Sequence, residues 1–183
     1  MRYAQGPGTH GEVVVAAEPG RVWELVSDIA LPARLSPELQ RTAWLDGASG
    51  PAVGARFEGH NRRAGTADWR TVCEVTELVE GRVFAWGVMD ADGCYGEPVD
   101  ALAGALARWR FDVADLADLS GGGDGGVRVR LSVVIGPGRS GLSVAIDAQP
   151  QREEEFVAFR LSELRAGVEA TLAGVKSLAE QGG

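Results

Sequence analysis

The sequence predicts an α+β fold: a curved, seven-stranded antiparallel sheet wrapped around one long C-terminal helix, with two short helices after the first strand. Three observations predict it. Apolar and polar residues alternate with a period of two through the middle of the chain, which is typical of half-buried strands. Most connections between these runs are short, as in antiparallel sheets. The end of the chain changes to apolar residues at three- and four-residue steps, which is typical of a helix.

The first strand and the two helices precede the rest of the sheet. EVVVAA, residues 12–17, is a β-branched run that predicts the first strand. Glu18-Pro19-Gly20 then opens a helix, because a proline in the first turn costs little, and this helix should end near Asp28. A second short helix is expected at about 31–39, with Ser36-Pro37-Glu38 as its own start or kink signal.

Two prolines, Pro32 and Pro37, divide this helical region. An interior proline costs a helix about 3 kcal/mol, so we expect the chain to turn sharply here. A curved sheet that grips one helix leaves an open end. We predict that the two short helices turn across this end and plug it.

Six further strands follow, and WRTVCEVTELV is the longest alternating run among them. Residues 90–103 are rich in turn formers and acids and predict an extended loop, and SGGGDGG at 120–126 predicts a flexible connection. The six strands are expected at 41–47, 55–63, 69–79, 82–89, 107–113 and 127–135.

Everything after Gln151 predicts one helix of about 28 residues, or roughly 40 Å. Three glutamates, residues 153–155, crowd its start, where the helix dipole favours acids. Before it, residues 136–150 form a linker with room for a short helical turn. The apolar stripe of the helix consists of Val157, Leu161, Leu164, Val168, Leu172 and Val175.

The composition fits a single domain over residues 1–183, with its core at about 11–180. The chain has 183 residues, 45% of them hydrophobic, and a net charge of −8, which disfavours binding to nucleic acids. It contains no signal-peptide core and no run of ~18 apolar residues. We therefore expect a cytoplasmic protein without stable membrane insertion, monomeric or homodimeric. Cys73 and Cys94 are expected to be reduced thiols rather than a disulfide.

No motif predicts a metal or a cofactor. GPGRSG at 136–141 matches a dinucleotide-binding spacing, but that site needs a parallel βαβ unit, and Pro137 removes an amide. His10 and His60 are too scattered among the cysteines to predict a zinc site. A nucleophile elbow, which a Ser-His-acid triad of the hydrolase type would need, is missing.

Alternation assigns the strand residues to two faces. In ARFEGHNRR, Phe57 and Asn61 share one face, whereas Glu58 and His60 share the charged face, which must contact water. A strongly twisted sheet does not close on one helix everywhere, so we expect an aromatic-lined hollow that binds small apolar ligands. Its predicted lining residues are Phe57, Asn61, Trp69, Thr71, Cys73, Phe84, Trp86, Trp109 and Phe111, with Phe156, Phe159 and Arg160 near the start of the long helix.

Each of these residues also has a purely structural interpretation. Tryptophan and phenylalanine dominate ordinary cores, and Trp23 and Trp44 are assigned to the core rather than to the hollow. A buried Asn61 needs a hydrogen bond, either to a neighbouring strand or to a ligand. The helix residues 156–160 either border the entrance or form a partly exposed helix edge.

Four stretches carry a family resemblance: PGRVWELVSDIALPARLSPELQRTAWLDG, VGARFEGHNRR, WRTVCEVTELVEGRVFAW and ARWRF. In this order they resemble the polyketide cyclase/dehydrase group of the SRPBCC (START-like, helix-grip) superfamily, over about residues 11–178. The resemblance implies the architecture of birch-pollen allergens, lipid-transfer START domains, aromatase/cyclases and many actinobacterial proteins. Relatives commonly carry an aromatic residue before the Ser-Pro, where this chain has Leu35.

The predicted hollow and the family resemblance suggest two alternative functions, and neither requires a cofactor. The first is binding of a hydrophobic small molecule, such as a lipid or a polyketide, in the cavity between sheet and helix. The second, which the resemblance implies, is an enzyme that assists aldol condensation and dehydration of a polyketide by confinement. A cyclase should place an acid–base pair in the hollow, whereas Glu58, His60 and Glu74 are predicted outside it. A protein-interaction module is a third alternative, which an apolar surface patch in place of the cavity would favour.

Overall fold

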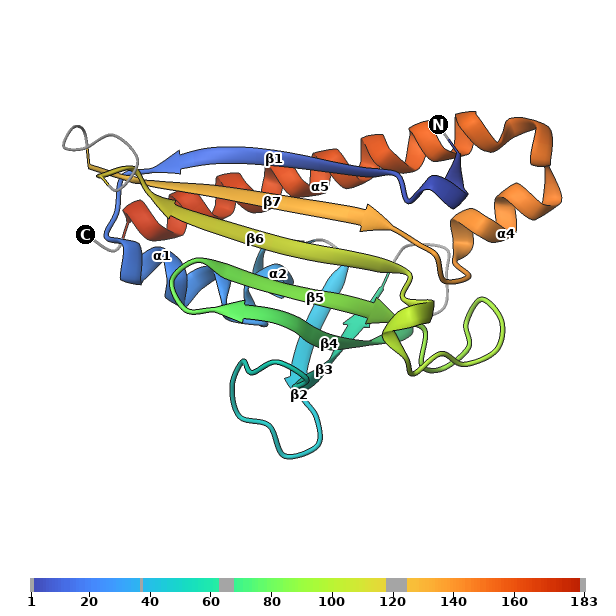
Figure 1. The fold of residues 1–183 in the computed structure, drawn as a ribbon, viewed down its shortest axis with the longest axis horizontal. Helices are drawn as coiled ribbons and strands as arrows, with labels where there is room; N and C mark the ends of the chain where they lie inside the picture. Colours follow the sequence, from blue (N-terminus) through green and yellow to red (C-terminus); the bar gives the residue numbers. More distant parts are fainter. Residues whose placement is uncertain (1, 37, 63–67, 118–124, 182–183) are drawn as a thin grey trace.

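Seven strands form one antiparallel sheet in the order β1-β7-β6-β5-β4-β3-β2, as predicted (Figure 1). The structure is a computed structural model that describes residues 2–36, 38–62, 68–117 and 125–181. The strands are β1 (Gly8–Val15), β2 (Leu39–Trp44), β3 (Arg56–Asn61), β4 (Trp69–Val79), β5 (Val83–Met89), β6 (Ala107–Asp115) and β7 (Val127–Ile135). The helices are α1 (Pro19–Val26), α2 (Leu31–Leu35), α4 (Gly141–Ala148) and α5 (Glu153–Glu180), with short 3-10 helices η1 (Tyr3–Gln5), η2 (Leu102–Gly104) and η3 (Pro150–Arg152).

The strand predicted at 41–47 is found at Leu39–Trp44, and three other elements differ from the prediction for identifiable reasons. β1 begins at Gly8 rather than at residue 12, because its pairing with β7 continues that far. α2 ends at Leu35 rather than near residue 39, because Ser36 precedes a proline and takes an extended backbone, φ −92° and ψ 135°. The linker at 136–150 contains a full helix, α4, which Ser140 caps through the backbone N–H of Ser143. Pro37 and parts of the predicted segments 55–63 and 120–126 lie outside the described residues.

The register of the strands produces the two predicted faces. Phe57 on β3 lies opposite Cys73 on β4, and Trp86 on β5 lies opposite both Val75 and Trp109. These side chains belong to the concave face, which carries most of the core. A bulge between Val75 and Glu77 shifts the alternation in β4, so that the pair after it on this face is Leu78 with Phe84.

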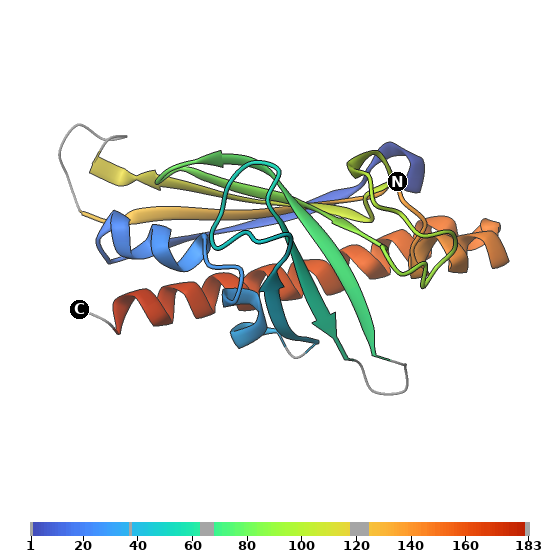
Figure 2. The same ribbon diagram turned by 90° about the horizontal axis from the view of Figure 1, so that it is seen from below.

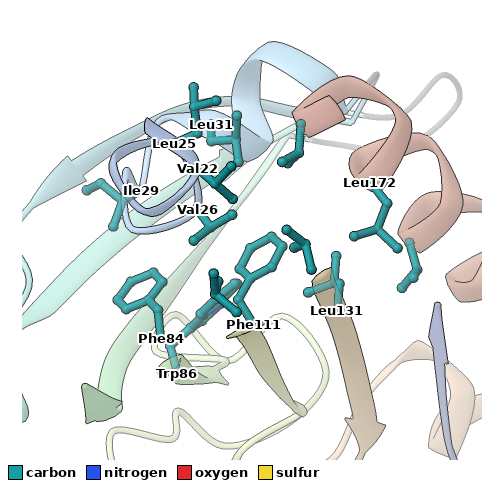
Figure 3. Close-up of a cluster of buried hydrophobic side chains, with 14 of the residues drawn as sticks. Val22, Leu25, Val26, Ile29, Leu31, Phe84, Trp86, Phe111, Leu131 and Leu172 are labelled. Atoms are coloured by element: carbon teal, nitrogen blue, oxygen red, sulfur yellow. The ribbon is translucent and has the colours of Figure 1, made fainter. Parts of the chain in front are cut away.

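The helices α1 and α2 close one end of the concave face, as the two prolines predict. Val22, Leu25 and Val26 of α1 are buried, and Figure 3 shows Val26 directed toward Phe84 and Phe111 of the sheet, whereas Leu25 lies beside Leu31 of α2. Leu35 at the end of α2 packs on α5: a Cβ added to Gly174 would lie 2.4 Å from its Cδ2.

The long helix α5 packs along β1 and β7 and beside α1 and α2, while the rest of the sheet curves past it (Figure 2). Gly11 permits this close approach, because a Cβ there would lie 3.1 Å from both Leu172 Cδ1 and Val168 Cγ1. Val168 and Leu172 are themselves buried. The helix therefore covers one side of the concave face and leaves the side of β4 and β5 to other elements.

Replacing Gly11 tests this close approach. We expect Gly11→Val to lower the free energy of unfolding by about 1–3 kcal/mol, because the added methyl groups overpack a filled contact. Gly20→Val is a control for glycine replacement outside the core, since no atom lies within 4 Å of an added Cβ there. Urea denaturation of both variants measures the difference, and equal losses would contradict the tight contact.

Two glutamates fasten the ends of α5 to the flanks of β1. Glu153, the first residue of the helix, accepts hydrogen bonds from the backbone N–H of Tyr3 at 2.8 Å and from the guanidinium of Arg2 at 2.7 Å. Glu180, the last residue, accepts the backbone N–H of Ala16 at 2.8 Å and the Lys176 ammonium at 2.6 Å. The pKa of Glu153 is lowered chiefly by the Tyr3 N–H and then by Arg2. The pKa of Glu180 is lowered chiefly by Lys176 and then by the Ala16 N–H.

These depressed pKa values predict an acid sensitivity with a definite sign. Each carboxylate stabilises the fold above its unfolded pKa of about 4.5, and this contribution is lost as the pH falls through the lower folded value. We expect the double variant Glu153→Gln/Glu180→Gln to lose stability less steeply than the parent between about pH 5 and pH 3. Urea midpoints across this range measure it, with Glu24→Gln on the exposed side of α1 as the control; parallel curves would contradict the assignment.

Candidate functional site

The structure divides the twelve predicted lining residues into three groups. Five lie in the core with exposed fractions of 8% or less: Phe57, Cys73, Phe84, Trp86 and Phe111. Six are half-buried: Asn61, Trp69, Thr71, Trp109, Phe156 and Arg160. Phe159 is 64% exposed on the outer edge of α5 and does not join the others.

Trp86 is the centre of the aromatic cluster on the concave face. Its ring centroid lies 5.1 Å from that of Phe84, 6.1 Å from Phe111 and 6.4 Å from both Phe57 and Trp109. The Trp109 ring stacks on it with an angle of 11° between the planes. The cluster thus runs from the closed end of the concave face, at Phe84, to the half-buried Trp109.

The half-buried residues mark the opposite, accessible end of this face. Trp69 and Asn61 pair across β4 and β3, beyond the last residue of β5. On the helix, the Arg152 guanidinium lies over the Phe156 ring at 4.8 Å, and Arg160 pairs with Glu163 at 3.2 Å. The loop at 90–106 and α4 both lie at this end of the molecule (Figures 1 and 2). The accessible end therefore combines aromatic surface from the sheet with Phe156 and Arg160 from the helix.

Sequence reasoning missed three further apolar residues of this region, Val88, Ala107 and Leu142, which are partly buried against the core. Val88 and Ala107 follow from the alternation, since each lies two residues from a predicted tryptophan. Leu142 was not predictable, because it comes from α4, where the sequence indicated no more than a linker with room for a short helical turn.

Few polar groups accompany these aromatics. Asn61 Nδ2 and Thr71 Oγ1 both donate to the carbonyl oxygen of Gly59, each over a long 3.4 Å. Burial raises the pKa of the Cys73 thiol to about 12, so it is not a nucleophile near neutral pH. Both cysteines are unpaired.

Glu58 and His60, the titratable pair considered for a cyclase, lie on the convex face. Glu58 accepts from His60 Nε2 at 2.8 Å and from Arg70 at 3.2 Å, and Arg70 also donates to Asp92 at 2.6 Å. The hydrogen bond from His60, followed by that from Arg70, lowers the pKa of Glu58. These residues face away from Phe57 and Cys73, as the alternation predicts, so this ion-pair cluster fixes β3 to β4 and to the loop at 90–106.

Two shallow hollows in the structure lie away from the aromatic cluster. One, of about 280 Å³, runs between the β1 edge and α5 and is lined by residues such as Glu12 and Leu172. The other, of about 310 Å³, lies between η1, α4 and the turn before α4. Neither is lined by any of the twelve predicted residues. The cavity between sheet and helix therefore stays a prediction.

Within the described ranges, no three His, Cys, Asp or Glu side chains gather as a metal site. The glycine-rich segment at 136–141 forms a turn between β7 and α4, beside an antiparallel sheet. No helix among the residues that the structure describes is long and apolar enough to span a membrane.

Comparison with known proteins agrees with this geometry. The family model described as polyketide cyclase/dehydrase and lipid transport matches residues 9–180. No curated protein sequence matches the chain. The polyketide-cyclase-like protein Cgl2372 from Corynebacterium glutamicum superposes with a TM-score of 0.62 at 24% identity, covering 94% of this chain and 91% of its own.

Two further solved structures share the fold at lower identity. The Zhui aromatase/cyclase from Streptomyces sp. R1128 has a TM-score of 0.61 at 17% identity, covering 96% of this chain and 94% of its own. Ara h 8.0201 has a TM-score of 0.52 at 14% identity, covering 93% of this chain and 98% of its own. These likenesses, together with the seven-stranded sheet and α5, identify the helix-grip fold.

Proposed function

The chain belongs to the polyketide cyclase/dehydrase and lipid transport family, and we propose that it binds a hydrophobic small molecule, lipid- or polyketide-like, between the concave face and α5. The observation that carries this proposal is that three large aromatic residues, Trp69, Trp109 and Phe156, are half-buried at the same end of the concave face. Large aromatic side chains gain stabilisation from each part of their apolar surface that is removed from water. A guest molecule that covered them would complete that burial.

The proposed ligand-binding residues are the twelve predicted from the sequence, with different contributions. The six half-buried residues contact the ligand first, whereas Phe57, Cys73, Phe84, Trp86 and Phe111 form the floor beneath it. Entry takes place at the end bordered by the loop 90–106 and α4, because α1 and α2 close the other end. Phe159 is too exposed to contribute more than an edge contact.

Binding is better supported than the alternative, a cyclase/dehydrase-type enzyme. That chemistry needs a positioned acid and base, but Glu58 and His60 point away from the concave face. The concave face offers the Asn61 amide and the Thr71 hydroxyl, which orient a ligand without taking up a proton at neutral pH. The fold likeness to the Zhui aromatase/cyclase keeps turnover as an alternative but supplies no residue for it.

A titration with two uncharged probes, 1-dodecanol and 2-acetylnaphthalene, tests the proposal. We expect at least one to bind and to quench tryptophan fluorescence, and Trp109→Leu to weaken binding about tenfold, because it loses the stacked ring. Phe159→Ala is the matched control and should bind like the parent. Native mass spectrometry of the protein as purified should show a retained apolar adduct. Absence of binding by both probes, with no adduct, would refute the proposal.

A further inference from the structure

The tryptophans of this chain have unused hydrogen-bond donors. The sequence contains five tryptophans, and among the described residues none of their indole N–H groups donates to a side chain or carbonyl. Four are half-buried and reach solvent. Trp86 is different, because it is only 8% exposed and its ring is surrounded by Phe57, Phe84, Trp109 and Phe111.

The indole nitrogen of Trp86 is nevertheless not fully covered by protein atoms. In the described part of the chain, one side-chain nitrogen or oxygen is both fully covered and without a partner, and it is Arg56 Nε. The Nε1 atom of Trp86 therefore remains within reach of a water-sized molecule, although its ring lies in the aromatic cluster. A buried tryptophan N–H normally finds an acceptor, and an unpaired donor in an apolar setting is costly. This donor is consequently available to a ligand.

The concave face around this donor is uncharged. On the described strands, Asp115 is the one charged residue that the alternation assigns to the concave face. It lies at the far end of β6, where its Oδ1 accepts the backbone N–H of Ala117. At the accessible end Arg160 is already paired with Glu163. An ionised group taken into this face would lose its hydration without gaining a partner. An uncharged oxygen, by contrast, needs only the donor that Trp86 offers.

We propose that the Trp86 indole N–H is the specificity-determining donor of the site, selecting ligands that place an uncharged acceptor oxygen, such as a ketone or an ether, against the aromatic cluster. The inference rests on the proposed function, since it concerns the same face. It disfavours both plain hydrocarbons, which leave the N–H unpaired, and free carboxylates, which pay the full cost of desolvation.

Three probes with one ring system separate these possibilities: 2-acetylnaphthalene, 2-ethylnaphthalene and 2-naphthoate. We expect the ketone to bind about three- to tenfold more tightly than the hydrocarbon, the range of one neutral hydrogen bond. The carboxylate should bind at least about tenfold more weakly than the ketone at pH 7. In Trp86→Phe, which keeps an aromatic ring and removes the N–H, the ketone and the hydrocarbon should bind equally. Trp23→Phe, outside the sheet, should preserve the parent preference.

The readout is the affinity for the ketone divided by the affinity for the hydrocarbon. A smaller ring at position 86 changes both affinities together, so this ratio reports the hydrogen bond alone. As a second measurement, the indole N–H resonance of Trp86 in the ¹⁵N-labelled parent protein should shift with the ketone and not with the hydrocarbon. Equal binding of ketone and hydrocarbon by the parent, or an unchanged ratio in Trp86→Phe, would overturn this inference and leave the proposed function standing. Failure of all three probes to bind would overturn this inference; if 1-dodecanol also failed to bind and no adduct were retained, the proposed function would fall as well.

Discussion

Phe111→Ala should destabilise the protein by about 3–5 kcal/mol, the usual cost of deleting a buried phenylalanine ring. Phe111 is 1% exposed, lies opposite Phe84 on β5 and Leu131 on β7, and contacts the Trp86 ring at 6.1 Å between centroids. Its removal leaves a cavity under α1 that rigid strands cannot collapse. Urea or thermal denaturation followed by circular dichroism measures the loss.

Phe159→Ala provides the matched control for this prediction. It deletes the same side chain from a position that is 64% exposed, so we expect a change within about 0.5 kcal/mol. If Phe111→Ala were as mild as this control, Phe111 would not be a core residue. The side chains beneath the proposed ligand would then be loosely packed.

Most of the fold was predictable because period-two alternation and helical spacing are local signals. The inward set of β3 and β4, from Phe57 to Val75, follows from alternation alone, and so does the outward position of Glu58 and His60. The α5 stripe from Val157 to Val175 is predicted by its spacing and is largely buried in the structure.

The candidate site was only partly predictable, because exposure depends on which distant element covers a residue. Alternation places Phe84 and Trp109 on the same face, but it does not say that α1 covers Phe84 while Trp109 stays half-buried. The bulge after Val75 was equally hidden, since nothing in the sequence of β4 marks it. Only a short helical turn was expected at α4, because glycines and prolines flank it and weaken its helical signal.

The convex face holds a second apolar cluster that alternation did not predict. Val72 and Met89 pair across β4 and β5 on this face and are 3% and 0% exposed. Ala105 in the loop 90–106 is fully buried, and a Cβ added to Gly87 would lie 2.5 Å from Leu102 Cδ2 of the same loop. The segment predicted as an extended loop therefore folds back over the sheet.

A single carboxylate holds the start of this loop. Asp90 is 3% exposed, and its two oxygens accept the backbone N–H groups of Cys94 at 2.9 Å and Tyr95 at 2.8 Å. The carbonyl oxygen of Tyr95 in turn accepts from Arg139 Nε at 2.8 Å. Asp90 thus joins the end of β5, the loop at the proposed ligand entrance and the turn before α4.

Asp90→Ala should therefore destabilise the protein by about 3 kcal/mol or more, because it removes two charge-assisted hydrogen bonds and leaves two backbone donors unpaired. The loss should be concentrated in the loop: the amides of Cys94 and Tyr95 should exchange with solvent much faster than those of β6 and β7. Asp90→Asn retains one acceptor oxygen and should lose roughly half as much stability. Hydrogen exchange with residue resolution, alongside urea denaturation, tests both claims. Unchanged protection at Cys94 and Tyr95 would mean that packing on Gly87 and Ala105, rather than the carboxylate, holds the loop in place.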